Sequence, residues 1–324
     1  MLHTFTAAVL CLTLLLVLMP GCSRIERIYY LHSGRYAQGI AALSKEYAQD
    51  PWNPELNYYL GRFHLGLGSG EQAAGYLKRA TILAPDLAEY HYWLGVAYWT
   101  ANEIDAEERA LERALALDPE HAPARLALAH NLLEQGRAAK ALTHYDVLLA
   151  AAPADAEALW GRARSLGKLG RKAEHRAALS AYLDVDHQGA RAAAAADELN
   201  AAGDFSWRTH SVGRKRLVLP AVEFAPGSDT LTVRAQAALA ALAREIQADP
   251  ALRLHVVAYV KGDQELARRR ALAVIEAASR GGQGKADGRL IPSWFGQAQR
   301  LRVAGTTRDV DESVLFITNA EKGA

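Results

Sequence analysis

The side chains that could carry out catalysis are scattered along this chain of 324 residues. Its 11 histidines include no His-Glu-x-x-His segment or similar spacing that would place two metal ligands on one helix face. Segment 66–70 has the glycines of a phosphate-binding loop, but no strand precedes it, and no serine lies in a Gly-x-Ser-x-Gly elbow. We therefore expect no enzymatic activity, no metal site and no cofactor.

The two cysteines, Cys11 and Cys22, lie close to the N-terminus. An apolar run of 15 residues from Phe5 to Met19 contains the first and ends shortly before the second. This run is shorter than the roughly 20 residues that a membrane-spanning helix needs, so we interpret residues 1–21 as an export signal. Because the remainder of the chain has no cysteine, disulfides, thiol catalysis and cysteine-ligated zinc are excluded.

Segment 18–22, Leu-Met-Pro-Gly-Cys, resembles the lipobox of bacterial lipoproteins, although its Met and Pro depart from the pattern. The resemblance implies that Cys22 is lipidated and becomes the first residue of the mature protein. Ser23 follows where some bacteria place an aspartate to retain lipoproteins at the inner membrane. The resemblance therefore favours an outer-membrane lipoprotein facing the periplasm. An uncleaved leader is the alternative, since no Lys or Arg precedes the apolar run.

The elements that position the remaining side chains follow a period of 34 residues. Four prolines keep this spacing, and four glycines with one asparagine keep it half a unit earlier: Pro51, Pro85, Pro119, Pro153 and Gly34, Gly68, Asn102, Gly136, Gly170. A proline ends one helix and favours entry into the next, and a glycine allows a tight turn between helices. The period therefore predicts helical hairpins that stack into an all-α solenoid, ending near His187.

Within each unit, large and small residues recur at fixed positions. In the unit 54–87, Leu60 and Gly61 are followed by Ala73, Leu77 and Ala80. This pattern resembles the tetratricopeptide repeat, and the following units repeat it, with Glu107 in place of one small residue. We expect a tetratricopeptide superhelix over residues 22–203, closed by an Ala-rich capping helix from residue 189.

In that family, fixed positions of each first helix line a concave surface that binds a peptide or helix of a protein partner. Carried over to this sequence, the surface pairs aromatic rings with charged groups, which suits peptide binding because rigid rings provide contact area at low entropy cost. The residues implied are Glu55, Tyr58, Arg62, Glu89, Tyr92, Trp99, His130, Trp160, Arg164 and Lys168. The alternative is that these aromatics pack within or between helices.

Charge is nearly balanced, with a net charge of +1, but it is unevenly distributed. Residues 22–203 hold 19 of the 37 Lys and Arg and 23 of the 36 Asp and Glu, so the remainder is mildly basic. Neither part has the basic stripe that phosphate neutralisation requires, and we expect no nucleic-acid partner.

The pattern changes after Gly203. Residues 204–216 lack helical periodicity, and we expect a linker whose basic run 214–216 is solvated. Strands and helices then alternate, which predicts an α/β sandwich over residues 217–324. The expected strands are 217–224, 252–260, 289–295 and 313–318, and the expected helices are 230–248 and 264–279.

Residues 222–231 resemble the opening of the OmpA-like peptidoglycan-binding domain, whose order is βαβαββ, and residues 266–274 resemble its second helix. In that family an Asp and an Arg hold the diaminopimelate of the peptide stem. Arg270 matches the Arg, whereas Lys261 stands in the place of the Asp, and Asp263 could substitute for it. An arginine pair before the last strand is replaced by Asp311 and Glu312, so the resemblance supports the fold better than the ligand.

Together these features predict a non-enzymatic, lipid-anchored periplasmic scaffold. Its repeat groove would bind a protein partner during assembly of an envelope machine such as a pilus or secretion complex. The alternative is a peptidoglycan tether that acts through the OmpA-like domain.

Overall fold

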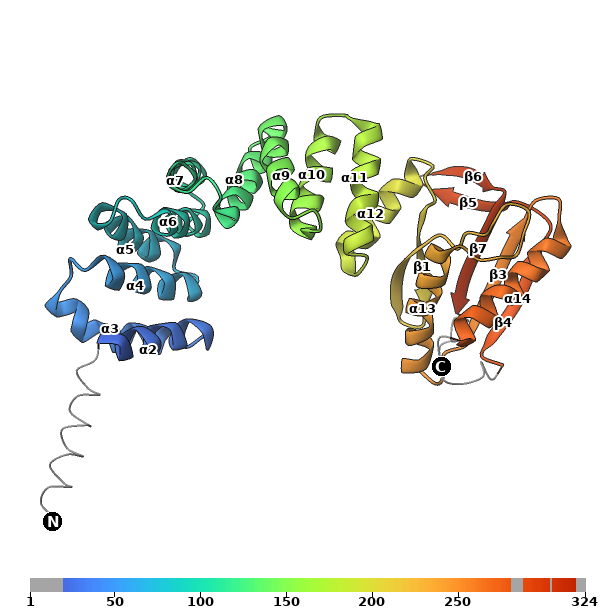
Figure 1. Ribbon diagram of the computed structural model, residues 1–324, viewed down its shortest axis with the longest axis horizontal. Helices are drawn as coiled ribbons and strands as arrows, with labels where there is room; N and C mark the ends of the chain where they lie inside the picture. The colour runs from blue at the N-terminus through green and yellow to red at the C-terminus, as the bar shows by residue number, and fades with distance from the viewer. Residues whose placement is uncertain (1–19, 281–287, 304, 319–324) are drawn as a thin grey trace, which may run out of the picture. The chain divides into compact units, whose positions relative to one another are not determined.

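The computed structural model describes residues 20–280, 288–303 and 305–318, and it divides the chain into two compact units, Met1–Pro153 and Ala154–Ala324 (Figure 1). We describe each unit by itself. The proposed leader lies almost entirely outside the described residues, as does the glycine-rich break after residue 280.

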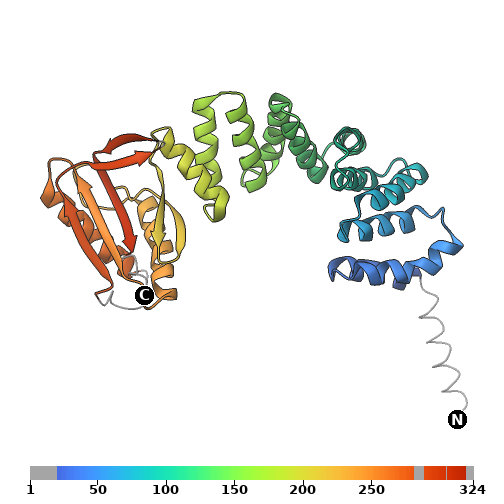
Figure 2. The same ribbon diagram turned by 180° about the vertical axis from the view of Figure 1, so that it is seen from behind.

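Antiparallel helical hairpins make up the first unit, with α2 packed on α3, α4 on α5, α6 on α7 and α8 on α9 (Figure 2). The helices are α2 (Pro20–His32), α3 (Tyr36–Gln49), α4 (Pro54–Gly66), α5 (Gly70–Leu83), α6 (Ala88–Thr100), α7 (Ile104–Leu117), α8 (Ala122–Glu134) and α9 (Ala138–Ala151). Contacts between α3 and α4, α5 and α6, and α7 and α8 join each hairpin to the next. The predicted stack of helical hairpins is confirmed.

The repeat positions have a direct packing reason. A Cβ atom on Gly61 would lie 2.5 Å from Cγ of Leu77, and one on Gly95 would lie 2.7 Å from Cδ2 of Leu111. A small residue on the first helix therefore lets the large residue of the second helix pack against its backbone. The turn within the third hairpin is made by Asn102, the one described non-glycine residue with a positive φ, at 59°.

Glycines of segment 66–70 are also explained by packing. A Cβ on Gly66 would lie 2.5 Å from the ring of Tyr36, and one on Gly70 would lie 2.6 Å from the backbone nitrogen of Ala101. Gly68 takes φ 71° at the turn, a conformation that favours glycine. The segment is thus a helical turn packed against its neighbours.

Among the described residues, the second unit has five helices, a five-stranded sheet and a two-stranded sheet. Its elements are α10 (Ala156–Lys168), α11 (Lys172–Val185), α12 (Gly189–Ala201), β1 (Trp207–Val212), β2 (Lys215–Pro220), α13 (Val233–Ala248), β3 (Leu254–Val260), α14 (Gln264–Arg280), β4 (Leu290–Phe295), β5 (Gln299–Val303), β6 (Thr306–Val310) and β7 (Glu312–Thr318). The sheet has the order β2-β1-β7-β3-β4, in which β1 is parallel to β7, β7 antiparallel to β3, and β3 parallel to β4. A solenoid followed by a small strand-containing domain is the architecture that the sequence predicted.

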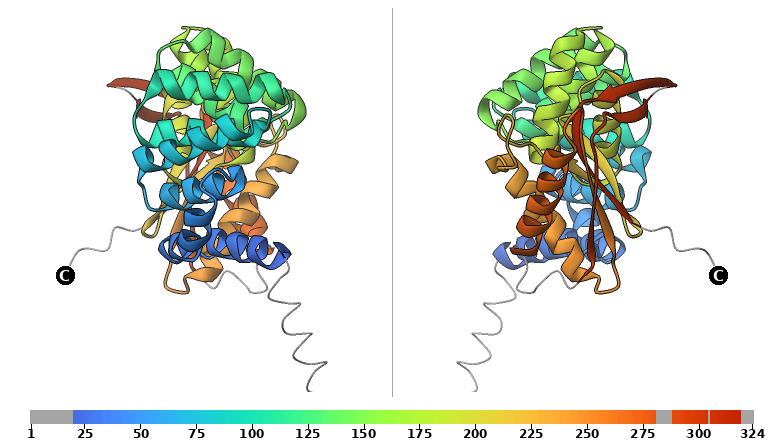
Figure 3. Two further views of the ribbon diagram at one scale, coloured as in Figure 1. Left: turned by 90° about the vertical axis from the view of Figure 1, so that its left-hand side faces the viewer. Right: turned by 90° about the vertical axis from the view of Figure 1, so that its right-hand side faces the viewer.

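Helices α13 and α14 cover one face of the sheet, in front of it in Figure 1 and behind it in Figure 2. The core beneath them includes Leu239, Leu242, Val256, Val274 and Phe316. The hairpin of β5 and β6 forms a separate two-stranded sheet that projects from one end of the domain (Figure 3).

Segment 204–216 is not a linker, because it contains β1 and the hairpin loop that leads into β2. The strand escaped prediction because two polar side chains occupy its buried side. His210 is 3% exposed and its ring lies 5.0 Å from that of Phe316, while buried Arg208 donates to Gln299 Oε1 at 3.2 Å. Burial, and secondarily the charge of Arg208, lowers the pKa of His210 to about 3.

The sequence predicted that helix α12 caps the repeat stack, and the structure shows that it also has a second neighbour. It buries Ala192, Ala195, Ala196 and Leu199, and it packs against α11 and the β1–β2 hairpin. The small alanines allow this close approach, so α12 is an interior helix of the second unit.

Candidate partner-binding groove

A cavity of about 360 Å³ lies on the first helices of the first three hairpins. We call it the repeat groove and define it by its lining: Leu31, His32, Tyr36, Arg62, Leu65, Gly66, Trp93, Val96, Trp99 and Thr100. Two of the predicted partner-binding residues, Arg62 and Trp99, line it directly. The indole of Trp99 is 62% exposed although it is a large apolar group.

A network of polar contacts centred on Glu89 fixes one wall of the groove. Its carboxylate accepts hydrogen bonds from Trp93 Nε1 at 2.7 Å and Tyr58 Oη at 3.3 Å, and it lies 3.2 Å from His121 Nε2. Arg62 donates to Tyr58 Oη at 2.6 Å, and its guanidinium carbon lies 3.6 Å from the ring centroid of Trp93. The arginine is therefore held flat against an indole, which orients it before any partner arrives.

The network also sets the acidity of its members. Burial alone would raise the pKa of the Glu89 carboxyl, but hydrogen bonds from Trp93, His121 and Tyr58 outweigh it, and the pKa is lowered. Burial raises the pKa of Tyr58 to about 12, so its hydroxyl stays protonated. The groove thus presents a fixed cation, Arg62, together with the exposed indole of Trp99.

The other predicted residues of the first unit are not part of the groove lining. Glu55 forms ion pairs with Arg24 at 3.6 Å and Arg27 at 3.4 Å. The Tyr92 ring packs 5.0 Å from those of Trp93 and His121, so it supports the network rather than presenting a free surface. His130 lies on α8, with its ring 5.7 Å from that of Tyr145.

Trp160, Arg164 and Lys168 lie on α10 and belong to the second unit. The Trp160 ring packs 5.2 Å from that of Tyr182, with the Arg164 guanidinium carbon 5.8 Å from its centroid. The Trp160 ring thus packs between α10 and α11, as the alternative interpretation of the aromatics expected, whereas Arg164 and Lys168 are exposed.

Sequence reasoning missed Trp93, His121 and Tyr36, because they stand outside the family positions. Trp93 follows Glu89 by one helical turn, and such i, i+4 pairs contact each other on a helix. That spacing was the available signal for the indole. Nothing local indicated His121, which lies 32 residues away on another hairpin.

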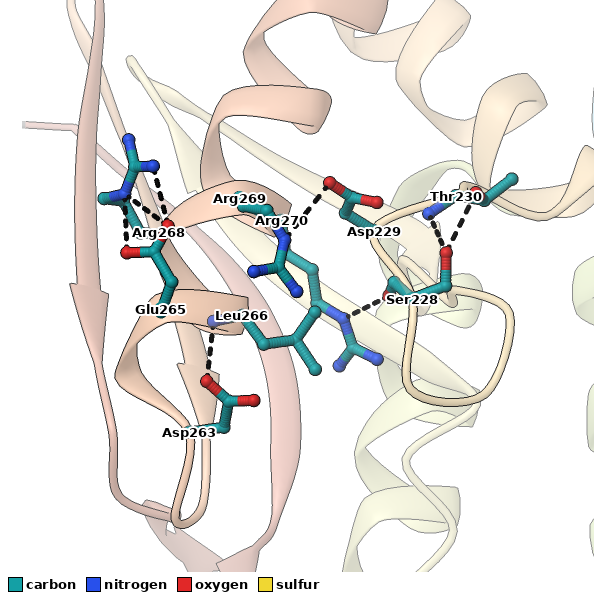
Figure 4. A network of polar contacts seen from close by, with 9 residues as sticks. All are labelled: Ser228, Asp229, Thr230, Asp263, Glu265, Leu266, Arg268, Arg269 and Arg270. Atoms are coloured by element: carbon teal, nitrogen blue, oxygen red, sulfur yellow. Dashed lines mark hydrogen bonds and ion pairs between the residues drawn. The ribbon is translucent and has the colours of Figure 1, made fainter.

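A second polar cluster contains the residues predicted to bind peptidoglycan (Figure 4). Arg270 is 2% exposed, donates from Nε to the Ser228 carbonyl at 2.8 Å and pairs through Nη1 with Glu312 at 2.7 Å. The Phe224 ring covers the guanidinium with its centroid 4.6 Å away. Neighbouring Arg269 pairs instead with Asp229, at 3.6 Å.

Asp263 and Lys261 are engaged as well. The Asp263 carboxylate accepts from the backbone nitrogen of Leu266 at 2.8 Å, near the start of α14, a contact that satisfies an otherwise unpaired N–H group (Figure 4). Lys261 lies 3.3 Å from the Asp311 carboxylate. The acidic residues 311 and 312 thus meet the two basic ones, 261 and 270, and neutralise both positions within the chain.

Other kinds of site have less support in the part of the chain that the structure describes. No group of three or more His, Cys, Asp or Glu there could hold a metal ion. Within the same residues, no helix has both the length and the apolar composition to cross a membrane.

Comparison with known proteins supports the reading of the first unit. Solved structures of MamA are similar to this chain: one is 26% identical, covering 48% of this chain and 91% of that one at a TM-score of 0.46. Another, of MamA from residue 41 to its end from Desulfovibrio magneticus RS-1, is 23% identical, covering 47% and 86% at 0.45. No curated protein matches the chain. Residues 30–95 and 98–160 match the tetratricopeptide repeat model, so this chain carries tetratricopeptide repeats, an architecture that serves as a scaffold for protein–protein interaction.

Proposed function

We propose that this protein is a lipid-anchored periplasmic scaffold whose repeat groove binds a segment of a protein partner during assembly of an envelope machine. The observation that carries the proposal is the repeat groove itself, where an exposed indole lies beside an arginine already fixed on a second indole. Rigid aromatic and arginine side chains contribute much of the affinity at protein interfaces, because little entropy is lost when they bind.

The groove also limits what the partner can be. A cavity of about 360 Å³ accommodates one or two side chains rather than a folded domain. An extended or helical segment with an apolar side chain for the cavity and a carboxylate for Arg62 fits these contacts best.

Crosslinking in the native cell tests this assignment, with a photoreactive residue placed at His32 in the groove wall. Trp99→Ala should remove the crosslinked partner while leaving the fold intact, because the indole is exposed. Trp52→Ala is the matched control, since this indole is 68% exposed and is not part of the groove lining. Equal loss of the crosslink in both variants, or in neither, would contradict the groove assignment.

The lipid anchor rests on the sequence of residues 18–22 and has its own test. Cys22→Ala should release the protein from the membrane fraction, whereas Cys11→Ala should leave it there, because only the former sits at the end of the lipobox-like segment. Separation of inner and outer membranes would then test the outer-membrane proposal based on Ser23. Membrane retention of the Cys22 variant would refute lipidation.

A second candidate, a peptidoglycan tether, is favoured by the strand order. In the second unit the succession β2-α13-β3-α14-β4 is followed, after the β5–β6 hairpin, by β7, which lies between β1 and β3 in the sheet, and this fits an OmpA-like domain. The chemistry of the site argues against ligand binding, because Glu312 occupies the guanidinium that would hold a ligand carboxylate.

Purified sacculi separate the two candidates. We expect the wild-type protein to stay in the supernatant and Glu312→Gln, which frees Arg270 without enlarging a cavity, to gain at most weak binding. The tether would be established instead if the wild type co-sediments with the sacculi, if Lys261→Ala strengthens this binding and if Arg270→Lys abolishes it.

A further inference from the structure

Strand β2 forms one edge of the five-stranded sheet, where it pairs with β1 alone. The two-residue loop between them consists of Gly213 and Arg214, and Gly213 takes φ 61°, as the first central residue of a type II′ turn requires. In such hairpins the residues that flank the loop, here Val212 and Lys215, form a hydrogen-bonded pair.

Hydrogen-bonded and non-hydrogen-bonded pairs alternate along an antiparallel ladder. Arg216 and Val218 pair with Ser211 and Thr209 at non-hydrogen-bonded positions, so their backbone N–H and C=O groups point away from β1. Of the two residues, Arg216 is exposed and Val218 is 3% exposed. The Ser211 carbonyl supports this assignment of the alternating positions, because it points away from β2 and accepts a hydrogen bond from the Thr318 hydroxyl on β7. Pro220 has no N–H and ends the stretch that can pair.

Open space borders this edge. A cavity of about 610 Å³ is lined by residues 215–219 of β2, by residues 187–189 at the start of α12 and by Ala241, Arg244 and Glu245 of α13. A second cavity, of about 740 Å³, shares Lys215 and Glu245 with the first and continues to Arg253. We call the two together the edge groove. Its walls are helices, so a strand could lie between them about 4.8 Å from β2.

The edge groove is predominantly basic. Its lining carries five cationic side chains, Arg214, Lys215, Arg216, Arg244 and Arg253, and two carboxylates, Glu245 and Asp249. The Lys215 ammonium pairs with Glu245 at 2.6 Å and Arg216 reaches Asp197 at 3.5 Å, yet both cationic side chains remain more than 60% exposed. The field along the edge is therefore positive.

This charge discriminates between possible occupants. The β2 edge of a second copy would bring the same cations opposite each other, and like charges facing each other across strands are destabilising. A strand that places carboxylates opposite these cations gains both main-chain hydrogen bonds and charge complementarity. We propose that an extended acidic segment of a partner protein binds in the edge groove as a sixth strand of the sheet, a docking surface separate from the repeat groove.

Binding of a defined peptide to the full chain tests the proposal. The probe is a fluorescein-labelled peptide in which Glu alternates with Val and Thr, and the same peptide with Lys for Glu is its counterpart. Anisotropy should show saturable binding of the acidic peptide that weakens with added salt, and no binding of the basic one. Arg216→Glu with Arg244→Glu should weaken binding by about tenfold or more. Arg300→Glu with Arg302→Glu, on exposed positions of β5, is the matched control and should bind as the wild type does.

Amide hydrogen exchange of the wild type provides a readout that does not depend on the stability of a variant. The bound acidic peptide should protect the N–H group of Arg216, which points away from β1 and belongs to an exposed residue in the free protein. Binding without this protection, or equal weakening by the control pair, would overturn the proposal. The proposal would also be overturned if the edge groove bound vesicles containing anionic phospholipid more tightly than it binds the peptide. Self-association of the protein that the Arg216 and Arg244 variants abolish would overturn it as well.

Discussion

Replacing Glu89 by alanine should loosen the repeat groove, because this carboxylate joins three side chains from α4, α6 and the start of α8. The change leaves the Trp93 indole N–H and the Tyr58 hydroxyl without their acceptor, and it removes the partner of His121. Glu89→Gln keeps the shape and one oxygen acceptor but removes the negative charge, so the two variants separate the hydrogen bonds from the ionic contribution.

The magnitude follows from these contacts. Hydrogen bonds to a charged group contribute about 1.5–3 kcal/mol each when they are buried. Half of the Glu89 side chain is exposed, at 51%, so solvent screening reduces the combined loss for Glu89→Ala to about 1–2 kcal/mol. With a urea dependence of about 2–3 kcal/mol per molar, the unfolding midpoint should fall by about 0.5 M.

The dependence on pH has a definite sign. Because the folded-state pKa of Glu89 is lowered, its ionised form stabilises the fold at pH values above the unfolded-state pKa, near 4.3. That contribution disappears as the pH falls through the folded-state value. The difference between the wild type and Glu89→Gln should therefore be largest at pH 7 and shrink below about pH 4.

Urea unfolding followed by circular dichroism at pH 7 and below about pH 4 measures these differences. Crosslinking of a partner to the groove residue at position 32 tests their functional consequence. Glu112→Gln, at an exposed position of α7, is the control and should leave the midpoint unchanged. A wild-type midpoint in Glu89→Ala at pH 7, or a Glu89→Gln difference that is the same at both pH values, would refute the role assigned to the network.

Three further predictions concern residues of the repeats. Gly61→Ala should lower the free energy of unfolding by about 1–3 kcal/mol, because its Cβ would overlap Leu77. In a double-mutant cycle followed by thermal unfolding, the same change made in a Leu77→Ala background should be nearly neutral. Asn102→Ala should cost about 1 kcal/mol because φ is 59°, whereas Asn102→Gly should be close to neutral. Burial raises the pKa of Glu107, so its ionised form opposes folding at neutral pH; Glu107→Gln should stabilise by about 1 kcal/mol at pH 7 and by less near pH 4 in urea titrations.

The repeat fold could be predicted because period and packing agree at the same residues. Gly61 and Leu77 satisfy the family pattern and also touch each other across the hairpin. In the second unit, β3 and α14 could be predicted from apolar runs and helical spacing. Strand β1 could not, because Arg208 and His210 are buried through contacts with Gln299 and Phe316, about a hundred residues further along the chain. Strand β5 is only five residues long, although Arg300, Leu301, Arg302 and Val303 do alternate, and β6 carries mostly exposed polar residues that leave no alternation to detect.

For the groove and its surroundings, the sequence predicted which side chains lie near the surface but not which of them contact each other. Tyr58, Arg62 and Glu89 were identified from family positions, and the structure brings them together through Trp93, which no family position includes. A residue-by-residue transfer finds the side chains that face a surface, but it cannot tell which of them are already bound to each other. Trp99 differs from the rest because its ring remains exposed and available to a partner.

The same distinction explains the basic character of residues beyond 203. Much of that positive charge is consumed locally: Arg268 pairs with Glu265 at 2.7 Å, and Lys261 and Arg270 pair with Asp311 and Glu312. Along the edge of β2, Lys215 and Arg216 pair with Glu245 and Asp197 but stay more than 60% exposed, and Arg214, Arg244 and Arg253 add three further cations. A pocket whose charges are neutralised from within the chain has little left to offer an ionic ligand, whereas an edge strand with unneutralised charge and outward amides attracts one. The position at which charge is left uncompensated, rather than the position that matches a binding motif, is therefore where we propose that this domain contacts a partner.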